Sequence, residues 1–321
     1  MDELDVRILK TLSLNVRRSF GAIARKMGVD EGTVRNRIRT LHETGFVEDW
    51  RLVVNPRLLG AGDVCVWFDA LPDVSRGDLV EQLQLMPGVY VIGVCHRNFF
   101  FVVFRHGSEY SPVNQLELIR RVARAETVTA GRIPYPDPGI QLSASDWAVL
   151  GAIYKHPRKT HAAIAKEVGL STRTIKRKLQ RMMQANAVGG FPALNPAGLR
   201  GAVMANLFVT YPLDCKDEVD LEVARAFDDY LMYTLHLMPL GTRDVVPCAY
   251  SLMLPNVPKG REAVDAAKQL SGVRTARLEL VEEVLTIFAP LEEEMEKHAN
   301  RLVARAGGGA PSKARASVRA R

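Results

Sequence analysis

Hydrophobic residues recur at helical spacing along the first part of the chain. Leucine and isoleucine return every four residues between positions 4 and 12, which predicts an amphipathic helix over residues 2–13. A second, shorter helix is expected over residues 19–27, with Gly28 ending it. Asp30 then suits the N-cap of a third, longer helix. Two short helices, a glycine-containing turn and a longer helix predict a helix-turn-helix.

The third predicted helix has one apolar side and one polar side. Val34, Ile38 and Leu41 cluster on one side of a helical wheel, so we expect that side to be buried. The polar side suits a recognition helix in the major groove of DNA, where early residues meet base edges and later cations meet phosphates. Its candidate DNA-binding residues are Thr33, Arg35, Asn36 and Arg39.

The same pattern returns 141 residues further along the chain. Residues 5–41 align with residues 146–182 without a gap, and the alignment pairs Arg17 with Arg158. Ser171 takes the place of Asp30 as the N-cap. Internal repetition of this length predicts a duplicated unit. The candidate DNA-binding residues of the second copy are Thr172, Arg173, Thr174, Lys176, Arg177 and Arg181.

Beyond each third helix the hydrophobic pattern changes to one typical of strands. Short extended segments at residues 46–56 and 187–196 predict a β wing, in which Arg51 is a candidate phosphate contact. The remaining order in both copies is strand, helix, strand, strand, helix, strand, which is the ferredoxin-like arrangement. The expected fold class is therefore α+β, a tandem duplication of a winged helix-turn-helix domain followed by a βαββαβ ferredoxin-like domain.

The alternation of patterns also predicts where the domains begin and end. Prolines at positions 134, 136 and 138 predict a stiff, extended connector between the copies, and a glycine-rich, basic composition predicts a disordered end. The expected organisation is a winged helix-turn-helix at 1–58, a ferredoxin-like ligand-sensing and dimerisation domain at 59–135, a proline-rich linker at 136–144, a second winged helix-turn-helix at 145–198, a second ferredoxin-like domain at 199–288, a C-terminal helix at 289–305 and a disordered basic tail at 306–321.

Charge and cysteine content narrow the range of partners. A net charge of +7 and a pI of about 9.3 favour a polyanionic partner, with nucleic acid first. No secretory signal is present and no apolar run approaches ~18 residues, so we expect no membrane partner and a cytoplasmic location. The four cysteines are far apart in the sequence and no catalytic motif occurs, so we expect no disulfide framework, no metal, no other cofactor and no catalytic residues.

Several short motifs stand in a characteristic order. The first helix contains D-x-x-I-L, the second A-I-A, and the third R-x-R-I-x-x-L followed by G-F-V, with N-P and L-G after the wing. Together with the βαββαβ order they resemble the Lrp/AsnC (feast/famine) family of transcription regulators, over residues 2–288. The resemblance implies a sequence-specific regulator that binds double-stranded DNA, that is not an enzyme, and whose ferredoxin-like domains pair into dimers.

Family members often sense amino acids, and the resemblance implies a place for such an effector. The family's ligand region has a glycine three residues before an acid, between the second and third strands. The first copy has His96 at the position of the acid, so it departs from this motif. The second copy keeps the motif, so the candidate effector-binding residues are Gly241, Thr242, Arg243 and Asp244.

Two other functions remain open at this point. Some proteins that resemble this family, the sirohaem decarboxylases, use the sheet domain as an enzyme on a tetrapyrrole. His96, Arg97 and Arg105 would be the residues to bind substrate carboxylates and transfer protons. The cationic recognition helices kept in both copies favour a regulator over such an enzyme. An architectural protein that coats DNA would differ from a regulator only in specificity.

The assembly also has two alternatives. An open apolar sheet face needs a partner, and a homodimer of two chains would supply it. The amphipathic segment at 291–303 favours this homodimer because it offers a further surface for a chain–chain contact. The two sheets of one chain could instead pair with each other as a pseudo-dimer.

Overall fold

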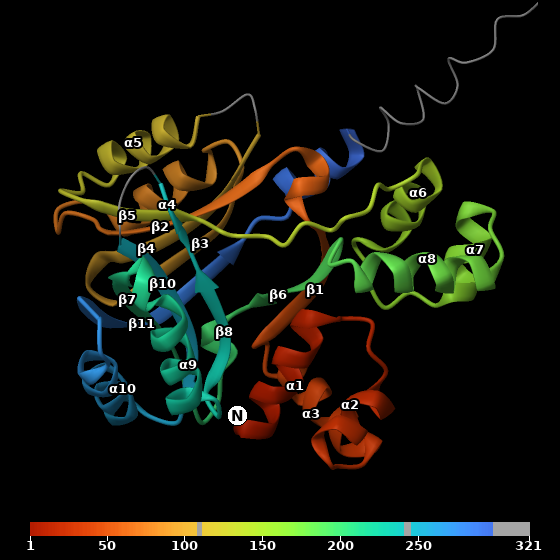
Figure 1. The fold of residues 1–321 in the computed structure, drawn as a ribbon, viewed down its shortest axis with the longest axis horizontal. Helices are drawn as coiled ribbons and strands as arrows, with labels where there is room; N and C mark the ends of the chain where they lie inside the picture. Colours follow the sequence, from red (N-terminus) through yellow and green to blue (C-terminus); the bar gives the residue numbers. More distant parts are fainter. Residues whose placement is uncertain (108–110, 241–244, 298–321) are drawn as a thin grey trace, which may run out of the picture.

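Figure 1 shows the fold of the computed structural model, which describes residues 1–107, 111–240 and 245–297. The first helix-turn-helix consists of α1 (Glu3–Leu14), α2 (Phe20–Met27) and α3 (Glu31–Glu43), and the second of α6 (Ala144–Ile153), α7 (His161–Val168) and α8 (Thr172–Gln184). Each is followed by one strand, β1 (Val47–Val54) or β6 (Val188–Leu194). We call residues 1–135 unit one and residues 144–286 unit two.

Each unit continues as the predicted βαββαβ domain, to which unit two adds one short strand of two residues between its second and third strands. Unit one has β2 (Gly62–Asp69), α4 (Arg76–Gln84), β3 (Val89–Cys95), β4 (Phe99–His106), α5 (Pro112–Val122) and β5 (Val128–Arg132). Unit two has β7 (Val203–Pro212), α9 (Lys216–Phe227), β8 (Leu231–His236), β9 (Met238–Pro239), β10 (Val245–Leu254), α10 (Val257–Gln269) and β11 (Thr275–Thr286). The α+β fold class and its duplication are therefore confirmed.

Local sequence explains where the helices of both DNA-binding modules begin and end. The predicted N-caps Asp30 and Ser171 accept hydrogen bonds from the third backbone N–H group of α3 and α8. Gly28 and Gly169 end α2 and α7 with φ values of 74° and 69°, a left-handed conformation that glycine adopts without strain.

The two predicted wings pair with each other. Strand β1 runs antiparallel to β6, with Val47 opposite Leu194 and Val54 opposite Val188. These two strands form a separate two-stranded sheet. Each predicted wing segment is therefore a strand, but each copy supplies only one such strand, and their pairing joins the two modules.

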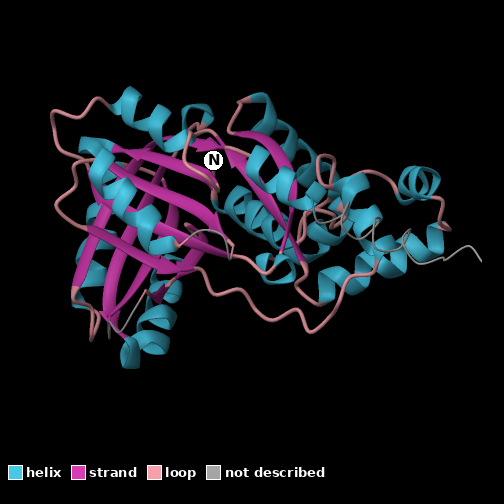
Figure 2. Cartoon of the chain, turned by 90° about the horizontal axis from the view of Figure 1, so that it is seen from above, coloured by secondary structure: helices cyan, strands magenta, loops and turns pink. Residues whose placement is uncertain are grey.

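The two ferredoxin-like domains share one nine-stranded sheet. Its order is β8-β10-β7-β11-β3-β4-β2-β5-β9, and β11 connects the halves by pairing with β7 and then with β3. The edge strands β8 and β9 are separated in the chain only by Leu237, so the sheet curves until its two edges meet. Figure 2 shows this curved sheet with helices on its outside.

Aromatic side chains from both units fill the inside of this sheet. Phe208 of β7 lies among three rings of unit one, with its ring centroid 4.8 Å from that of Trp67, 5.0 Å from Phe99 and 6.5 Å from Phe101. The apolar faces that would have to be covered by a second chain are therefore covered within one chain. The two ferredoxin-like domains of one chain are therefore arranged as a pseudo-dimer. An open sheet face is no longer an argument for a homodimer of two chains.

The C-terminal segment also packs inside the chain. Residues 289–297 are helical, Met295 is buried, and Leu291 packs against the same core. Glu294 lies 2.9 Å from the Nη1 atom of Arg105. The described part of the predicted helix thus contacts its own chain, and the chain–chain contact expected of the segment at 291–303 stays a prediction. The tail at 306–321 lies outside the described residues.

Two adjacent glycines of β6 allow a test of how tightly the modules are joined. A Cβ atom on Gly190 would lie 2.8 Å from the carbonyl oxygen of Leu12 and 2.9 Å from Cβ of Val16, both in unit one. A Cβ atom on Gly189 would meet nothing closer than 4.0 Å. Gly190→Ala should therefore reduce the free energy of unfolding by about 1–3 kcal/mol, measured by chemical denaturation. Gly189→Ala is the matched control, and an equal loss in both variants would contradict this close contact.

Candidate nucleic-acid interface

The recognition helix of unit one exposes the predicted residues Arg35, Asn36 and Arg39, but its two outer arginines are paired. Arg35 lies 2.7 Å from Glu31 and Arg39 lies 3.6 Å from Glu43, each within one turn of α3. Asn36 is exposed. Since these exposed ion pairs are weak, they reduce the net positive charge of the surface without fixing the arginines firmly.

Two threonines of the predicted set have a structural role. Thr33 donates to Asp30 through both its backbone N–H and its hydroxyl, and these hydrogen bonds lower the pKa of the Asp30 carboxyl. Thr174 contacts the Ser171 hydroxyl in the same way at the start of α8. Both threonines therefore fix the N-terminus of a recognition helix, while Thr172 is exposed beside this cap.

The recognition helix of unit two presents unpaired cations. Arg173, Lys176 and Arg177 are exposed, and within the described ranges none of their side chains forms an ion pair or a hydrogen bond. Their charges are thus available to an external anion. The opposite side of α8 is core, since Ile175 and Leu179 are buried.

A buried aspartate anchors each recognition helix to the first helix of its module. Asp146 of α6 lies 2.9 Å from Lys178 and 2.6 Å from Arg181. Burial raises the pKa of Asp146, but hydrogen bonds from Ser143 and Lys178 outweigh burial and leave the pKa below its usual value. Arg181 is therefore first an anchor of α8, although half of its side chain remains exposed.

Unit one has the equivalent anchor. Asp5 of α1 is buried and lies 3.3 Å from Arg37 of α3, and Arg37 also binds Asp2 at 2.8 Å. Arg35, Arg37 and Arg39 stand at alternate positions on α3. Because Arg37 binds the two aspartates, its side chain points away from the outer face of the helix.

Reciprocal contacts fix the two modules relative to each other. Arg17, in the turn after α1, donates to the carbonyl of Pro157, and Arg158, in the matching turn after α6, donates to the carbonyl of Val16 at 2.7 Å. The Arg158 guanidinium also lies over the Phe20 ring, 4.4 Å from its centroid. The repeat alignment pairs Arg17 with Arg158, so the sequence contained the signal for this contact, but the helical pattern alone did not assign it.

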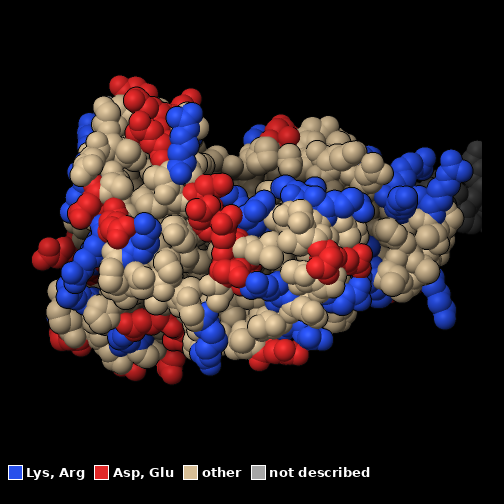
Figure 3. All heavy atoms as spheres, turned by 90° about the horizontal axis from the view of Figure 1, so that it is seen from below, with Lys and Arg blue, Asp and Glu red and all other residues tan. Residues whose placement is uncertain are grey.

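Figure 3 shows how charge is distributed over one face of the molecule. Lysine and arginine gather over the end that carries α6, α7 and α8 and over the adjoining part of the helix-turn-helix modules. Acidic side chains form a band between this region and the sheet. The cations thus collect where the candidate DNA-binding helices lie.

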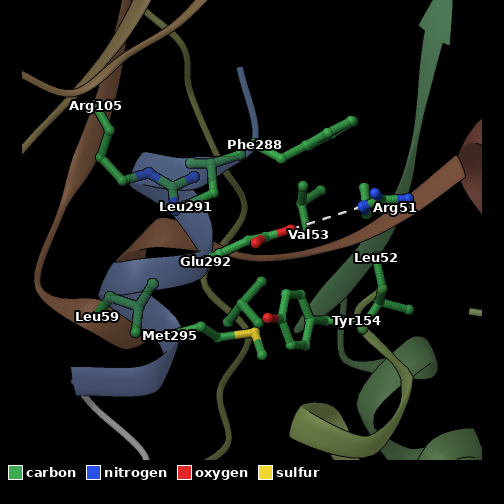
Figure 4. A pocket seen from close by; sticks show the side chains of 11 residues that line it. Arg51, Leu52, Val53, Leu59, Arg105, Tyr154, Phe288, Leu291, Glu292 and Met295 are labelled. Carbon is green, nitrogen blue, oxygen red and sulfur yellow. Dashed lines mark ion pairs between the residues drawn. The ribbon is translucent and has the colours of Figure 1, made fainter. Parts of the chain in front are cut away.

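The wing cation Arg51 does not belong to this surface. Its guanidinium packs over the Phe288 ring at 4.7 Å, it pairs with Asp49, and its Nε atom lies 3.8 Å from Glu292 (Figure 4). Only a fifth of its side chain is exposed. The interpretation of Arg51 as a phosphate contact is therefore wrong, because the C-terminal segment covers it.

The residues considered for an enzyme do not meet in one place. His96 and Arg97 lie in the turn before β4, whereas Arg105 lies at the far end of that strand. The Arg105 side chain is only 9% exposed and is bound to Asp63 at 2.8 Å. His96 instead pairs with Glu282 at 2.9 Å. The candidate effector residues Gly241, Thr242, Arg243 and Asp244 lie outside the described residues.

Comparison with known proteins agrees with this geometry. Residues 1–42 match the AsnC-type helix-turn-helix domain, and residues 142–188 match a winged helix-turn-helix DNA-binding domain. The HTH-type transcriptional regulator Ptr1 of Methanocaldococcus jannaschii is 43% identical over 60 residues, which cover 19% of this chain and 40% of Ptr1. The HTH-type transcriptional regulator LrpA of Pyrococcus horikoshii is 32% identical over 101 residues, which cover 29% of this chain and 72% of LrpA.

A solved structure with both units is also similar. The crystal structure of the siroheme decarboxylase NirDL superposes with a TM-score of 0.54 over 95% of this chain and 100% of that chain. At 17% sequence identity this similarity shows the fold alone.

Fold and surface together define a tandem helix-turn-helix protein of the DNA-binding class. The match to LrpA then shows that the chain belongs to the Lrp/AsnC family of transcription regulators. In the described part of the chain, no helix is long and apolar enough to cross a membrane.

Proposed function

We propose that this protein is a sequence-specific DNA-binding transcription regulator in which one chain supplies both recognition modules. The observation that carries the proposal is the fixed pair of capped helix-turn-helix modules, one of which exposes three unpaired cations on its recognition helix. A protein that contacts two adjacent major grooves needs two such helices at a constant separation. The β1–β6 pairing and the contacts of Arg17 and Arg158 hold the two modules, and hence their recognition helices, in a fixed relative position.

The two modules contribute differently in this proposal. The surface of α8 carries unpaired cations and supplies most of the attraction to phosphates. On α3, Asn36 is exposed and uncharged, which suits a contact to adenine in the major groove. Because the two helices differ, the target is an asymmetric pair of half-sites rather than a palindrome.

Salt titration of binding to duplex DNA tests the function. If six to eight phosphates are engaged, log K should fall with log salt at a slope of roughly −5 to −7. Asn36→Ala should reduce the preference for specific over non-specific DNA by about 1–3 kcal/mol and leave the slope unchanged. A slope near zero would remove DNA as the partner.

The mass of the free protein tests the proposed assembly. Because both sheet faces are covered within one chain, light scattering should give a mass near 35.6 kDa at micromolar concentrations. A mass of twice that value would support the homodimer instead, with four DNA-binding modules in one particle.

We also propose that an amino acid binds at residues 241–244 as a small effector. The proposed location is the cytoplasm, and the proposal assigns no catalytic activity. Family resemblance supports the effector. Titration calorimetry with individual amino acids, repeated on Asp244→Ala, tests it, since an amino acid that binds both proteins equally does not use this segment.

A further inference from the structure

A cluster of metal-binding side-chain types lies on the outer face of the sheet in unit two. Asp220 projects from α9, His236 ends β8, and Cys248 lies on β10. The Nδ1 atom of His236 is 3.0 Å from Oδ2 of Asp220 and 3.6 Å from Sγ of Cys248. All three potential ligand atoms lie within 4.8 Å of one another.

The fold does not require charged groups at this place. In unit one the buried strand residues on the helix-covered face are apolar, among them Phe68, Phe100 and Phe104. The same face of unit two instead brings a carboxylate, an imidazole and a thiol together. The duplicated unit therefore shows that an apolar core is sufficient here, so core packing does not account for the polar cluster.

Two of the three separations between these atoms are close to those of tetrahedral zinc coordination. With Zn–N of about 2.0–2.1 Å and Zn–S of about 2.3 Å, neighbouring ligand atoms lie roughly 3.3–3.6 Å apart. Two of the observed separations, 3.0 Å and 3.6 Å, need only small shifts to reach this range. We propose that Asp220, His236 and Cys248 form a binding site for Zn²⁺ in unit two, independent of the DNA-binding surface.

Charge balance supports a divalent cation. A carboxylate and a thiolate together neutralise the two charges of Zn²⁺, and neutral histidine completes three protein ligands. Lys216 now lies 2.8 Å from Oδ2 of Asp220, the oxygen that also faces His236. In the metal-free protein the Lys216 ammonium therefore neutralises the Asp220 carboxylate, as the metal would. It must move away when the metal binds.

The remaining neighbours of the site orient the ligands. Tyr211 and Tyr250 donate to Oδ1 of Asp220 at 2.7 Å and 2.9 Å, so Oδ2 becomes available to the metal once Lys216 moves away. Such outer contacts hold a ligating carboxylate in position. Cys248 is buried, and because the thiolate is the form that binds a metal, metal binding must release the thiol proton. About a third of the His236 side chain is exposed, which gives a cation a route to the site.

The sequence gives no sign of this site. The three ligands stand at positions 220, 236 and 248, and these spacings match none of the compact patterns that identify zinc sites. Only the pairing of β8 with β10, which places Cys248 opposite His236, brings two of them together. For this reason the cysteines gave no prediction of a metal.

Titration of the metal-free full-length protein with Co²⁺, which occupies tetrahedral zinc sites and is visible spectroscopically, tests the proposal. We expect one equivalent to give visible d–d bands of tetrahedral intensity and a near-ultraviolet thiolate charge-transfer band, both abolished by Zn²⁺. Cys248→Ser should remove the charge-transfer band, and Cys248→Ser and His236→Gln should each weaken Co²⁺ binding by at least about 100-fold.

Two control variants test which cysteine binds the metal and whether Lys216 competes with the metal for Asp220. Cys215→Ser removes the nearest other thiol in the sequence, at the start of α9, and should leave the spectrum unchanged. Lys216→Met removes the competing ammonium and should tighten Co²⁺ binding by about tenfold or more. An absent charge-transfer band in the wild-type protein, or a band that persists in folded Cys248→Ser, would overturn the proposal. Circular dichroism establishes that each variant is folded, and His236→Gln provides a second test if Cys248→Ser is not.

Discussion

Replacing Arg173, Lys176 and Arg177 together by alanine should weaken binding to duplex DNA by several hundred-fold at about 0.1 M salt. All three side chains are exposed on α8, and within the described ranges they have no anionic partner. If each neutralises one phosphate, their loss should make the slope of log K against log salt less negative by about 2.7. Near 0.1 M salt this corresponds to roughly 3–4 kcal/mol of binding free energy. Fluorescence anisotropy at several salt concentrations measures both quantities.

The matched control is the double variant Arg35→Ala with Arg39→Ala on α3. These arginines are also exposed, but each already pairs with a glutamate of its own helix, so the loss per residue should be smaller. Neither variant touches the core, and both should melt at the wild-type temperature. An equal loss per residue in both variants would contradict the proposed division between the two modules.

The sequence predicted the helices and strands well because their signals are local. The caps at Asp30 and Ser171, the ending of α2 at Gly28 and the apolar stripe of α8 depend on residues within a few positions of one another. Duplication was equally visible, since it requires only the alignment of the chain with itself. These features together were sufficient to predict the order of elements in both units.

The pairing of the units could not be predicted in the same way. Strand β1 faces β6 more than 130 residues later, and Val47 and Val188 occupy opposite ends of this pairing. A hydrophobic pattern indicates that a strand needs a partner, but it does not identify the partner. A second chain or the second half of the same chain could each supply that partner. The segment at 291–303 favoured a homodimer, but in the structure its described part packs against its own chain.

The candidate site shows a similar limit. The helical wheel placed Arg35, Arg39, Arg177 and Arg181 on outer faces, but it could not show which cations have partners. Arg181 binds Asp146, which stands 35 residues earlier, whereas the Arg177 side chain has no partner in the described part of the chain. Which charges are free for DNA is therefore a property of tertiary contacts.

Replacing Asp63 by alanine should destabilise the protein by about 3–5 kcal/mol. Its side chain is fully buried at the start of β2, where it binds Arg105 through both oxygens at 2.8 Å and 3.2 Å. It also accepts hydrogen bonds from Tyr90 at 2.9 Å and from Tyr135 at 2.7 Å. Tyr135 belongs to the segment that leads into the linker, so Asp63 holds that segment against the sheet of unit one. Without Asp63, the buried charge of Arg105 keeps only Glu294 as an anionic partner among the described residues.

Asp69, at the other end of the same strand, is the matched control. It also binds an arginine through both oxygens, with Arg277 at 2.6 Å and 2.7 Å, but more than half of the Asp69 side chain is exposed. Asp69→Ala should therefore cost no more than about 1 kcal/mol, because water replaces the lost contact. Urea denaturation measures both variants, and equal losses would contradict the argument from burial. A third variant, Asp63→Leu with Arg105→Met, should recover part of the loss, because the larger cost comes from leaving one buried charge unpaired rather than from losing the pair.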